Sequence, residues 1–374
     1  SELPRFRALA AREGRDLPAL GAPPRKSLRP GDRAAGLAEV RERLSAWGDL
    51  GNAALAVPDA NLYDEALAAG VRAFQARMGY EADGVLGRST WAALATPFPW
   101  RLRQIELALE RLRWLPHLGE RPFLAVNIPM FRLFAWGSVP ASGAPEFSMG
   151  VIVGRALKTG TPVFVEEMEY VIFQPYWNVP RSILQKELLP LIRKDPSYLA
   201  REEMEIVQGP GDDGRVLEAT DEALDRLARG ELRLRQRPGR KNALGPVKFM
   251  FPNDDNVYLH GTPAPALFGR ARRDFSHGCV RVEDPFRLAR FVLRDQPEWT
   301  DDAIGAAMQG QPSKRVSLTR PLRVVMYYVT AAVIPGEGLR FADDIYNHDR
   351  KLDAALRARH AREMTPRAPS PTAR

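Results

Sequence analysis

The chain has 374 residues, of which 45% are hydrophobic, 27% charged and 9% aromatic. Because a single hydrophobic core stops growing at roughly 250–300 residues, this length predicts two or three domains. The composition is that of an ordinary globular protein, which excludes wholesale disorder and a fibrous repeat.

The formal net charge of +8 favours an acidic partner: nucleic acid, an anionic membrane surface or an anionic cell-wall polymer. The lysines and arginines are scattered and no nucleic-acid-binding motif accompanies them, so we expect no nucleic-acid partner. The longest uncharged apolar run, residues 324–335, is about half the roughly 20 residues that a spanning helix needs. We therefore expect no transmembrane segment in this sequence; if the protein is exported, its leader is absent from it.

Residues 1–30 are rich in Arg, Ala, Gly and Pro and predict an extended lead-in or the remnant of a larger domain. Residues 31–97 predict a small helical domain, because apolar residues recur at helical spacing over 34–47 and 63–78. A third short helix is expected to end near residue 94, with Ser89 or Thr90 as its N-terminal cap. Any small helical bundle has such apolar stripes, so spacing alone gives this domain no function.

Residues 98–120 form a predicted link, whose amphipathic helix over 100–118 is stopped by Pro116. Many short β-type runs follow within residues 121–335 and predict a mostly β domain. The expected strands cover 123–128, 130–136, 147–153, 170–173, 247–251, 257–260, 280–282 and 322–329.

The charged stretch at about 182–237 predicts a helical insertion over the sheet, and such insertions often act as lids. The chain is expected to close with a helical segment at 336–360. Its last residues, 361–374, are rich in Pro and Arg and predict a disordered tail.

Cys279 is the only cysteine, which excludes an internal disulfide framework. Two of the five histidines, His260 and His277, lie within twenty residues of it. A thiol attacks an acyl carbon well only as the thiolate, and this requires an imidazole or another positive group nearby. His260 ends one strand-like run and Cys279 begins another, so neighbouring strands can bring the two side chains together.

Two other interpretations compete with a nucleophile. In the first, Cys279 is a small buried apolar residue and both histidines are satisfied polar groups. In the second, Cys279, His260 and His277 bind a metal. A structural zinc site needs a fourth ligand, and no paired Cys or His spacing supplies one, so we expect no metal.

The segment His260-Gly261-Thr262, followed by Ser276-His277-Gly278-Cys279-Val280-Arg281, resembles the signature of the L,D-transpeptidase catalytic domain, the YkuD type. The similarity extends to the large periplasmic, YcbB-like subfamily of Gram-negative bacteria. It is carried there by Glu110-Arg111-Leu112-Arg113-Trp114, Val126-Asn127-Ile128-Pro129, Tyr176-Trp177-Asn178-Val179-Pro180, Asn242-Ala243-Leu244-Gly245 and Lys248-Phe249-Met250-Phe251-Pro252-Asn253. Residues 31–97 resemble a three-helix peptidoglycan-binding domain through Ala73-Phe74-Gln75, Asp83-Gly84-Val85-Leu86-Gly87 and Thr90-Trp91-Ala92-Ala93-Leu94.

The resemblance implies an α+β fold: a mostly β catalytic domain with a helical capping insertion, joined to a small peptidoglycan-binding domain. It implies that Cys279 is the acylated nucleophile and His260 the base, oriented by a backbone carbonyl near Gly261. It also implies that His277 and Gly278 shape the oxyanion site. Substrate-binding roles are expected for the residues around this centre, namely Arg281, Tyr258, Trp177, Gly261 and Ser276.

The implied reaction is a cysteine-dependent acyl transfer without cofactor. A thioester forms on meso-diaminopimelate of a tetrapeptide stem, D-alanine leaves, and diaminopimelate of a neighbouring stem resolves the thioester into a 3→3 cross-link. The expected location is the periplasm, with roles in cell-wall organisation and cell shape and with sensitivity to carbapenems. Lipoprotein attachment, trimming of the stem and a non-catalytic wall-binding scaffold remain as alternatives.

Overall fold

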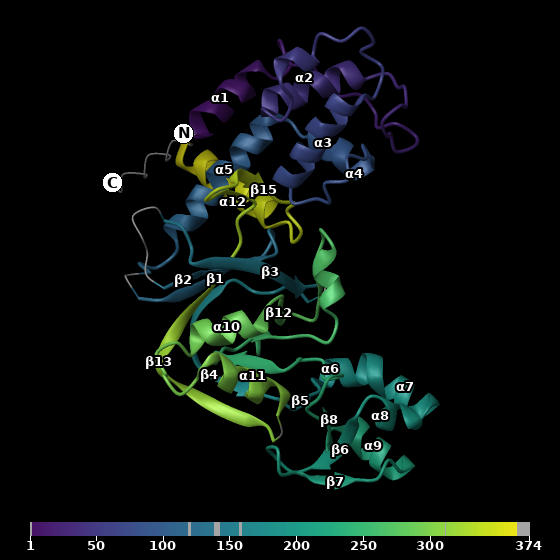
Figure 1. Ribbon diagram of the computed structural model, residues 1–374, viewed down its shortest axis with the longest axis vertical. Helices are drawn as coiled ribbons and strands as arrows, with labels where there is room; N and C mark the ends of the chain where they lie inside the picture. The colour runs from purple at the N-terminus through teal and green to yellow at the C-terminus, as the bar shows by residue number, and fades with distance from the viewer. Residues whose placement is uncertain (1, 119–120, 138–142, 157–158, 311, 365–374) are drawn as a thin grey trace, which may run out of the picture.

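The computed structural model describes residues 2–118, 121–137, 143–156, 159–310 and 312–364. Three parts follow one another along the long axis in Figure 1: a helical module, a β domain and the insertion. The predicted α+β class, with a mostly β domain and a small helical domain, is confirmed. Within the described residues, no helix is both long enough and apolar enough to cross a membrane.

The helical module consists of α1 (Glu2–Arg12), α2 (Leu37–Trp47), the short η1 (Asn52–Ala54), α3 (Glu65–Arg77) and α4 (Arg88–Ala95). The Asp64 carboxylate caps α3 by accepting a hydrogen bond from the Leu67 amide at 2.8 Å. The predicted cap of α4 is wrong: Gly87 occupies the N-cap, and Ser89 and Thr90 lie inside the helix. Thr90 instead accepts a hydrogen bond from Gln75 of α3, so its hydroxyl joins two helices.

The expectation of little regular structure before residue 31 is wrong for α1. Phe6 is fully buried, and its ring lies 5.5 Å from the rings of both Trp47 and Phe341. The buried Arg43 of α2 pairs with Glu13 at 2.8 Å and donates to the Leu94 carbonyl at 2.7 Å. These contacts make α1 part of the module's core, although its sequence carries only two buried apolar residues, Phe6 and Leu9.

Helix α5 (Phe98–Arg113) leads from the module to the β domain and ends five residues before the predicted boundary at 118. Within the described residues, nine strands form one sheet in the order β11-β3-β12-β10-β9-β4-β13-β1-β2, and β2 also pairs with β3. The sheet therefore closes on itself like a barrel. Its strands are β1 (Phe123–Asn127), β2 (Arg132–Trp136), β3 (Phe147–Gly154), β4 (Phe164–Phe173), β9 (Val247–Met250), β10 (Leu259–His260), β11 (Asp274–Ser276), β12 (Val280–Val282) and β13 (Lys314–Tyr327).

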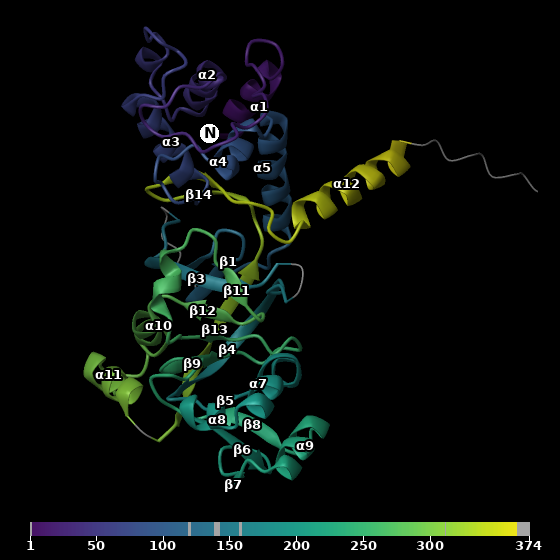
Figure 2. The ribbon, with the colours of Figure 1, turned by 90° about the vertical axis from the view of Figure 1, so that its right-hand side faces the viewer.

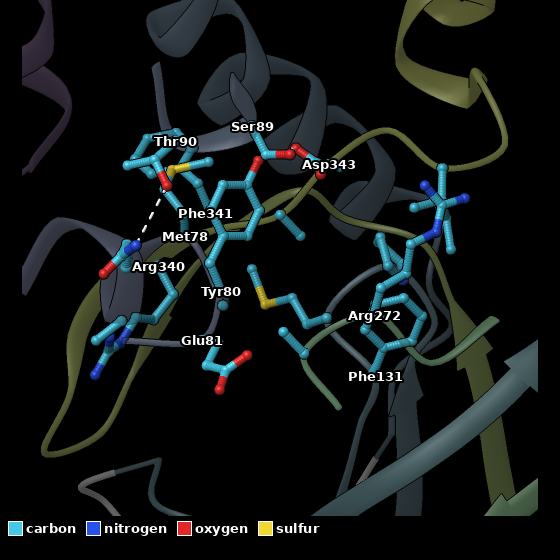
Figure 3. Close-up of a pocket in the computed structure, with 18 of the residues that line it drawn as sticks. Met78, Tyr80, Glu81, Ser89, Thr90, Phe131, Arg272, Arg340, Phe341 and Asp343 are labelled. Carbon is cyan, nitrogen blue, oxygen red and sulfur yellow. Dashed lines mark hydrogen bonds between the residues drawn. The ribbon is translucent and has the colours of Figure 1, made fainter. Parts of the chain in front are cut away.

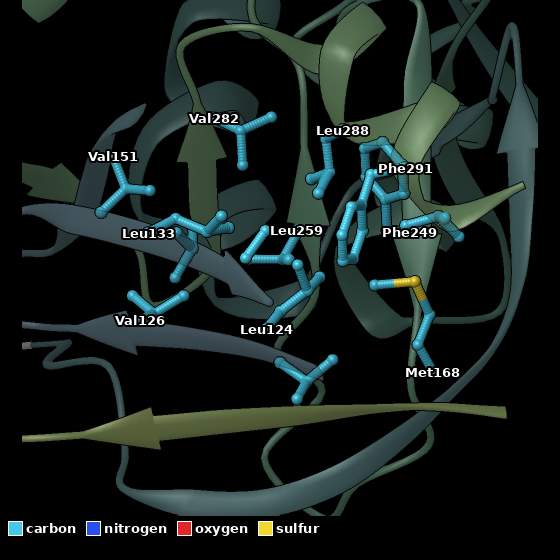
Figure 4. Packing of buried hydrophobic residues seen from close by; sticks show 14 of the residues in the cluster. Leu124, Val126, Leu133, Val151, Met168, Phe249, Leu259, Val282, Leu288 and Phe291 are labelled. Carbon is cyan, nitrogen blue, oxygen red and sulfur yellow. The ribbon is translucent and has the colours of Figure 1, made fainter. Parts of the chain in front are cut away.

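Side chains that alternate along these strands separate the barrel's interior from its outer face. Leu124 and Val126 of β1 point into the main core, whereas Phe123 and Ala125 pack outside it. Helices α10 (Pro285–Val292) and α11 (Asp301–Gln309) cover the core with Leu288, Phe291 and Ile304. Figure 4 shows Leu288 and Phe291 facing Phe249 and Leu259 of the central strands.

Several strands differ from the prediction. β4 begins at Phe164 instead of 170, β13 begins at Lys314 instead of 322, and β11 was not predicted. The extra residues of β4 pair with the predicted part of β13, and the extra residues of β13 pair with the predicted part of β4. They include Glu166, Glu167 and Arg315 on accessible positions. These charges interrupt the apolar pattern that sequence analysis follows, while the backbone pairing is unaffected by them.

The insertion was predicted to be helical, but it contains strands as well as helices. It contains a four-stranded sheet in the order β5-β8-β6-β7, built from β5 (Trp177–Asn178), β6 (Met204–Gln208), β7 (Arg215–Leu217) and β8 (Arg233–Gln236). Its helices are α6 (Arg181–Ile183), the π-helix η2 (Leu184–Leu188), α7 (Leu189–Lys194), α8 (Ser197–Arg201) and α9 (Asp221–Arg229). Sheet and helices enclose a separate small core that includes Ile192, Ile206 and Leu227.

The chain returns to the helical module after β13. The predicted helical segment at 336–360 did not include this return. Strands β14 (Ala331–Ile334) and β15 (Gly338–Phe341) form a hairpin whose Phe341 enters the module's core. Helix α12 (His348–Met364) follows and projects sideways from the body in Figure 2. Residues 361–364 thus continue a helix instead of the expected disordered tail, and residues 365–374 lie outside the described residues.

Phe341 supplies a test of this hairpin contact. Phe341 is 1% exposed and packs against Phe6, Trp47 and the Arg101 guanidinium. Its replacement by alanine leaves a cavity in the module. We expect Phe341→Ala to lower the free energy of unfolding by about 3–5 kcal/mol in denaturant titrations. The control Val333→Ala, on the same hairpin but 65% exposed, should change it by less than about 0.5 kcal/mol. Equal effects of the two substitutions would contradict the packing described here.

Candidate active site

The pairing of three strands determines which side chains surround Cys279. β10 pairs in parallel with β12, with Leu259 opposite Val280 and His260 opposite Arg281. β9 pairs with the other edge of β10 and sets Lys248 opposite His260. Phe249, Leu259 and Val280 point into the core. Because side chains alternate along strands, Lys248, His260 and Arg281 form a row on the opposite face.

Cys279 lies just before β12, on this same face, in a cavity of about 510 Å³. Its thiol donates to the Asn256 carbonyl at 3.7 Å. Burial raises the pKa of the Cys279 thiol, while hydrogen bonds from the Tyr258 amide and hydroxyl, and the charges of Lys248 and Arg281, lower it. Tyr258 therefore lies next to the sulfur.

His260 lines the same cavity and is 4% exposed. Its Nδ1 lies 2.6 Å from the Gly261 carbonyl oxygen, which only accepts, so Nδ1 carries the proton and Nε2 has the free lone pair. Burial, together with the charges of Arg281 and Lys248, lowers the pKa of His260 to about 3. The ring is neutral at neutral pH. Among the described residues no hydrogen bond joins it to Cys279, although the two side chains line the same cavity.

The loop that carries Cys279 is held by its own polar groups. The Ser276 hydroxyl donates to the Cys279 carbonyl at 2.5 Å and accepts from the Gly278 amide at 3.2 Å. Gly278 has φ +121°, a conformation that side-chain-bearing residues rarely adopt. The Thr161 hydroxyl donates to the Gly278 carbonyl at 2.7 Å. In this arrangement Ser276 braces the loop, and the Gly278 amide is already occupied.

These contacts redistribute the predicted roles around the nucleophile. Gly278 was expected to help shape the oxyanion site, but its amide donates within the loop to Ser276. No acceptor for the Cys279 amide is found in the described part of the chain. Gly261 orients His260 through its carbonyl. A Cβ there would lie 2.9 Å from Pro246 Cδ, which explains a glycine at this position.

The insertion contributes one wall of the cavity and contacts the Cys279 loop. Trp177 of β5, Ser182 and Ile183 line the cavity. His277 Nε2 lies 2.7 Å from the Glu187 carboxylate of η2 and donates to it. The His277 ring is therefore turned towards the insertion. A π-helical turn at this contact fits the frequent occurrence of such turns at functional sites.

A second cavity, of about 450 Å³, lies between the helical module, the β domain and the β14–β15 hairpin. Figure 3 shows Tyr80 at its centre, and the Tyr80 hydroxyl donates to Asp343 at 2.8 Å. Phe131 and Arg272 of the β domain face it from the other side. It shares no residue with the cavity at Cys279, so the candidate nucleophile is confined to the latter.

Three residues at the site were not predicted from the sequence. Lys248 lies between the buried Val247 and Phe249. The alternation of side chains in this strand could have indicated that Lys248 points away from the core. Glu187 and Thr161 act from segments 90 and 117 residues away, and no local pattern announces such contacts. No group of three or more His, Cys, Asp or Glu side chains in the described residues is arranged to hold a metal ion.

A sequence model of the L,D-transpeptidase catalytic domain (YkuD) matches residues 121–312, just over half of the chain. The chain belongs to the L,D-transpeptidase family. A second model, the "Putative peptidoglycan binding domain", matches residues 33–94. The cavity at Cys279 thus lies inside the L,D-transpeptidase domain, and the helical module corresponds to the second match.

Individual relatives give more distant similarities. A curated "Putative L,D-transpeptidase" of Haemophilus influenzae is 31% identical over 253 residues, which cover 68% of this chain and 49% of the relative. The chain therefore spans about half the length of that relative. An L,D-transpeptidase structure from Xylanimonas cellulosilytica is 16% identical, covers 82% of this chain and 100% of its own, and has a TM-score of 0.23. L,D-transpeptidase 3 of Mycobacterium tuberculosis, bound to a faropenem-derived adduct, is 13% identical, with coverages of 55% and 59% and a TM-score of 0.24.

The buried, neutral His260 of this member of the L,D-transpeptidase family predicts a pH dependence of stability. Its pKa in the folded state, about 3, lies below the ordinary value of 6.5, so below pH 6.5 the unfolded chain binds the extra proton. The contribution of the neutral His260 ring to the free energy of unfolding is therefore complete above pH 6.5. It is lost as the pH falls towards 3. Between pH 7.5 and 5 this loss amounts to about 2 kcal/mol.

The measurement is the free energy of unfolding by urea titration at several pH values, with His260→Gln as the comparison. The variant lacks the titrating imidazole but keeps a polar side chain of similar length. Its unfolding free energy should fall by about 2 kcal/mol less between pH 7.5 and 5 than that of the unmutated protein. Parallel pH curves for the two proteins would show that His260 is not buried in neutral form.

Proposed function

We propose that this protein is a cysteine-dependent peptidoglycan L,D-transpeptidase that forms 3→3 cross-links between stem peptides. The observation that carries the proposal is the position of Cys279 and His260 on one face of β10 and β12, in a single cavity of the L,D-transpeptidase domain. The helical module, which matches a peptidoglycan-binding model, supports peptidoglycan as the polymer. The proposed location is outside the cytoplasm, in the periplasm.

In the first half-reaction, His260 Nε2 takes the thiol proton and the Cys279 sulfur attacks the carbonyl carbon of meso-diaminopimelate at stem position three. The carbon–sulfur bond forms, the bond to the D-alanine nitrogen breaks, and that nitrogen takes the proton from the imidazolium. Tyr258 and the cations beside the sulfur stabilise the thiolate. The Cys279 amide is the proposed donor to the oxyanion.

In the second half-reaction, the side-chain amine of diaminopimelate on a neighbouring stem attacks the thioester. A carbon–nitrogen bond forms, the carbon–sulfur bond breaks, and the amine proton returns to the thiol through His260. The exchange needs no added energy source, because a thioester is replaced by an amide. Trp177 is proposed to contact the stem from the insertion, whose position beside the cavity suits a substrate cap.

The test is mass spectrometry of purified disaccharide-tetrapeptide incubated with the protein and, in parallel, with Cys279→Ala. We expect the unmutated protein alone to yield a dimer that has lost one D-alanine, and fragmentation should place the new bond between two diaminopimelate residues. Tripeptide without dimer would indicate water as the acceptor and would refute cross-linking. The absence of both products from folded protein would refute the donor assignment as well.

The contact between Glu187 and His277 predicts how the insertion contributes. Glu187→Gln removes the charge that attracts the His277 ring while it keeps the side chain's size. Because this contact is exposed, we expect a modest rise in KM for the tetrapeptide donor, up to about fivefold. Alkylation of Cys279 by iodoacetamide, a reagent too small to need the cap, should not change.

The matched control is Glu218→Gln, an exposed glutamate of the same insertion away from the cavity. It should leave both KM and the alkylation rate unchanged. If Glu187→Gln slows alkylation as much as turnover, the contact acts on the thiol loop instead of on substrate capping.

A further inference from the structure

Two positive charges that form no ion pair within the described residues face the active-site cavity, whose lining also includes Asp255. Lys248 and Arg281 line the cavity on the strands that flank His260. In the described part of the chain neither forms an ion pair: the Lys248 ammonium lies 3.7 Å from the centre of the Tyr258 ring, and Arg281 Nε is buried without a hydrogen-bond partner.

Partly buried cations without a counter-charge are unfavourable, since burial removes water that is not replaced. Burial indeed lowers the pKa of both Lys248 and Arg281. Two buried arginines elsewhere have a carboxylate partner: Arg43 pairs with Glu13, and Arg235 pairs with Glu205 at 2.9 Å. Within the described residues the buried Arg101 has none, but it donates to Gln104 and to the Ala93 carbonyl. The contact with Tyr258 compensates Lys248 only in part. This arrangement is typical of a binding site in which an anionic group of the substrate supplies the missing negative charge.

We propose that Lys248 and Arg281 together bind the free α-carboxylate of the residue that leaves during acylation, the C-terminal D-alanine of the donor stem. This assignment rests on the proposed function. Of the carboxylates in a tetrapeptide stem, that of D-alanine lies nearest to the bond that Cys279 attacks, separated from the scissile carbonyl only by the amide nitrogen and one α-carbon. Adjacent strands are spaced about 4.8 Å apart, so cations on either side of His260 are within one residue's reach of the sulfur.

The subsite makes Lys248 a specificity-determining residue that the catalytic motif does not include. A donor whose terminal carboxylate is blocked as the amide, or displaced by an additional residue, leaves the two cations unpaired. It should bind more weakly, whereas a stem that ends at D-alanine satisfies both. Arginine at position 248 should preserve selection, because it carries the same charge; methionine should abolish it while still covering the Tyr258 ring.

The experiment measures binding separately from turnover. Calorimetry at pH 7 compares the synthetic tetrapeptide L-Ala-γ-D-Glu-meso-diaminopimelate-D-Ala with its C-terminal amide, on the Cys279→Ala protein, which cannot be acylated. We expect the acid to bind about tenfold or more tightly than the amide. Adding Lys248→Met should weaken the acid by a similar factor with little effect on the amide, and Lys248→Arg should restore selectivity. Lys194→Met, which removes an exposed charge from α7, is the matched control and should change neither affinity.

Equal affinities for acid and amide, no binding of the acid up to millimolar concentration, or equal weakening of both by Lys248→Met would overturn the assignment. Iodoacetamide alkylation with Cys279 intact distinguishes a role at the sulfur: a slower reaction in Lys248→Met with selectivity unchanged would assign Lys248 to the thiolate and also overturn it. Selective binding of the acid through Lys248 without release of D-alanine by the unmutated protein would refute the proposed reaction and leave the subsite standing.

Discussion

The parallel register between β10 and β12 is the constraint on which the rest of the active site depends. It places His260 beside Arg281, and Tyr258 and Cys279 one step away on the same face, while Leu259 and Val280 anchor both strands in the core. A shift of either strand by one residue would exchange these faces and bury the polar set. The apolar core and the reactive face are therefore fixed by the same hydrogen-bond ladder.

Support for the nucleophile's loop comes from a part of the chain far from it in sequence. Thr161 donates to the Gly278 carbonyl, and the Tyr346 hydroxyl accepts from the Thr161 amide at 3.2 Å and donates to the Gly154 carbonyl at 2.6 Å. Tyr346 follows the β14–β15 hairpin, whose Phe341 is buried in the helical module. The module and the active-site loop are thus joined through one short segment that follows the barrel.

The sequence predicted the parts of this structure that local patterns encode. Helical spacing indicated α2 and α3, apolar runs indicated β3 and β12, and the His-Cys motif indicated residues that line one cavity. It did not predict α1 or the hairpin, because their few apolar residues form no local pattern and are buried only by packing on the module. It did not predict the insertion's sheet, because those strands are short and charged. Lys248 and Glu187 escaped for a related reason: one is defined by the face of its strand, and the other by a contact across 90 residues.

The charges around His260 connect substrate binding with catalysis. Burial is the first cause of the low pKa of His260, and the positive charges of Arg281 and Lys248 lower it further, so the resting imidazole is a weak base. A carboxylate held between these two cations would offset their charge and raise the basicity of His260 at the moment when the thiol must lose its proton. The same offset would also raise the pKa of the Cys279 thiol, which these cations otherwise lower. The two effects on proton transfer oppose each other, so the cations act chiefly in binding the carboxylate-bearing donor.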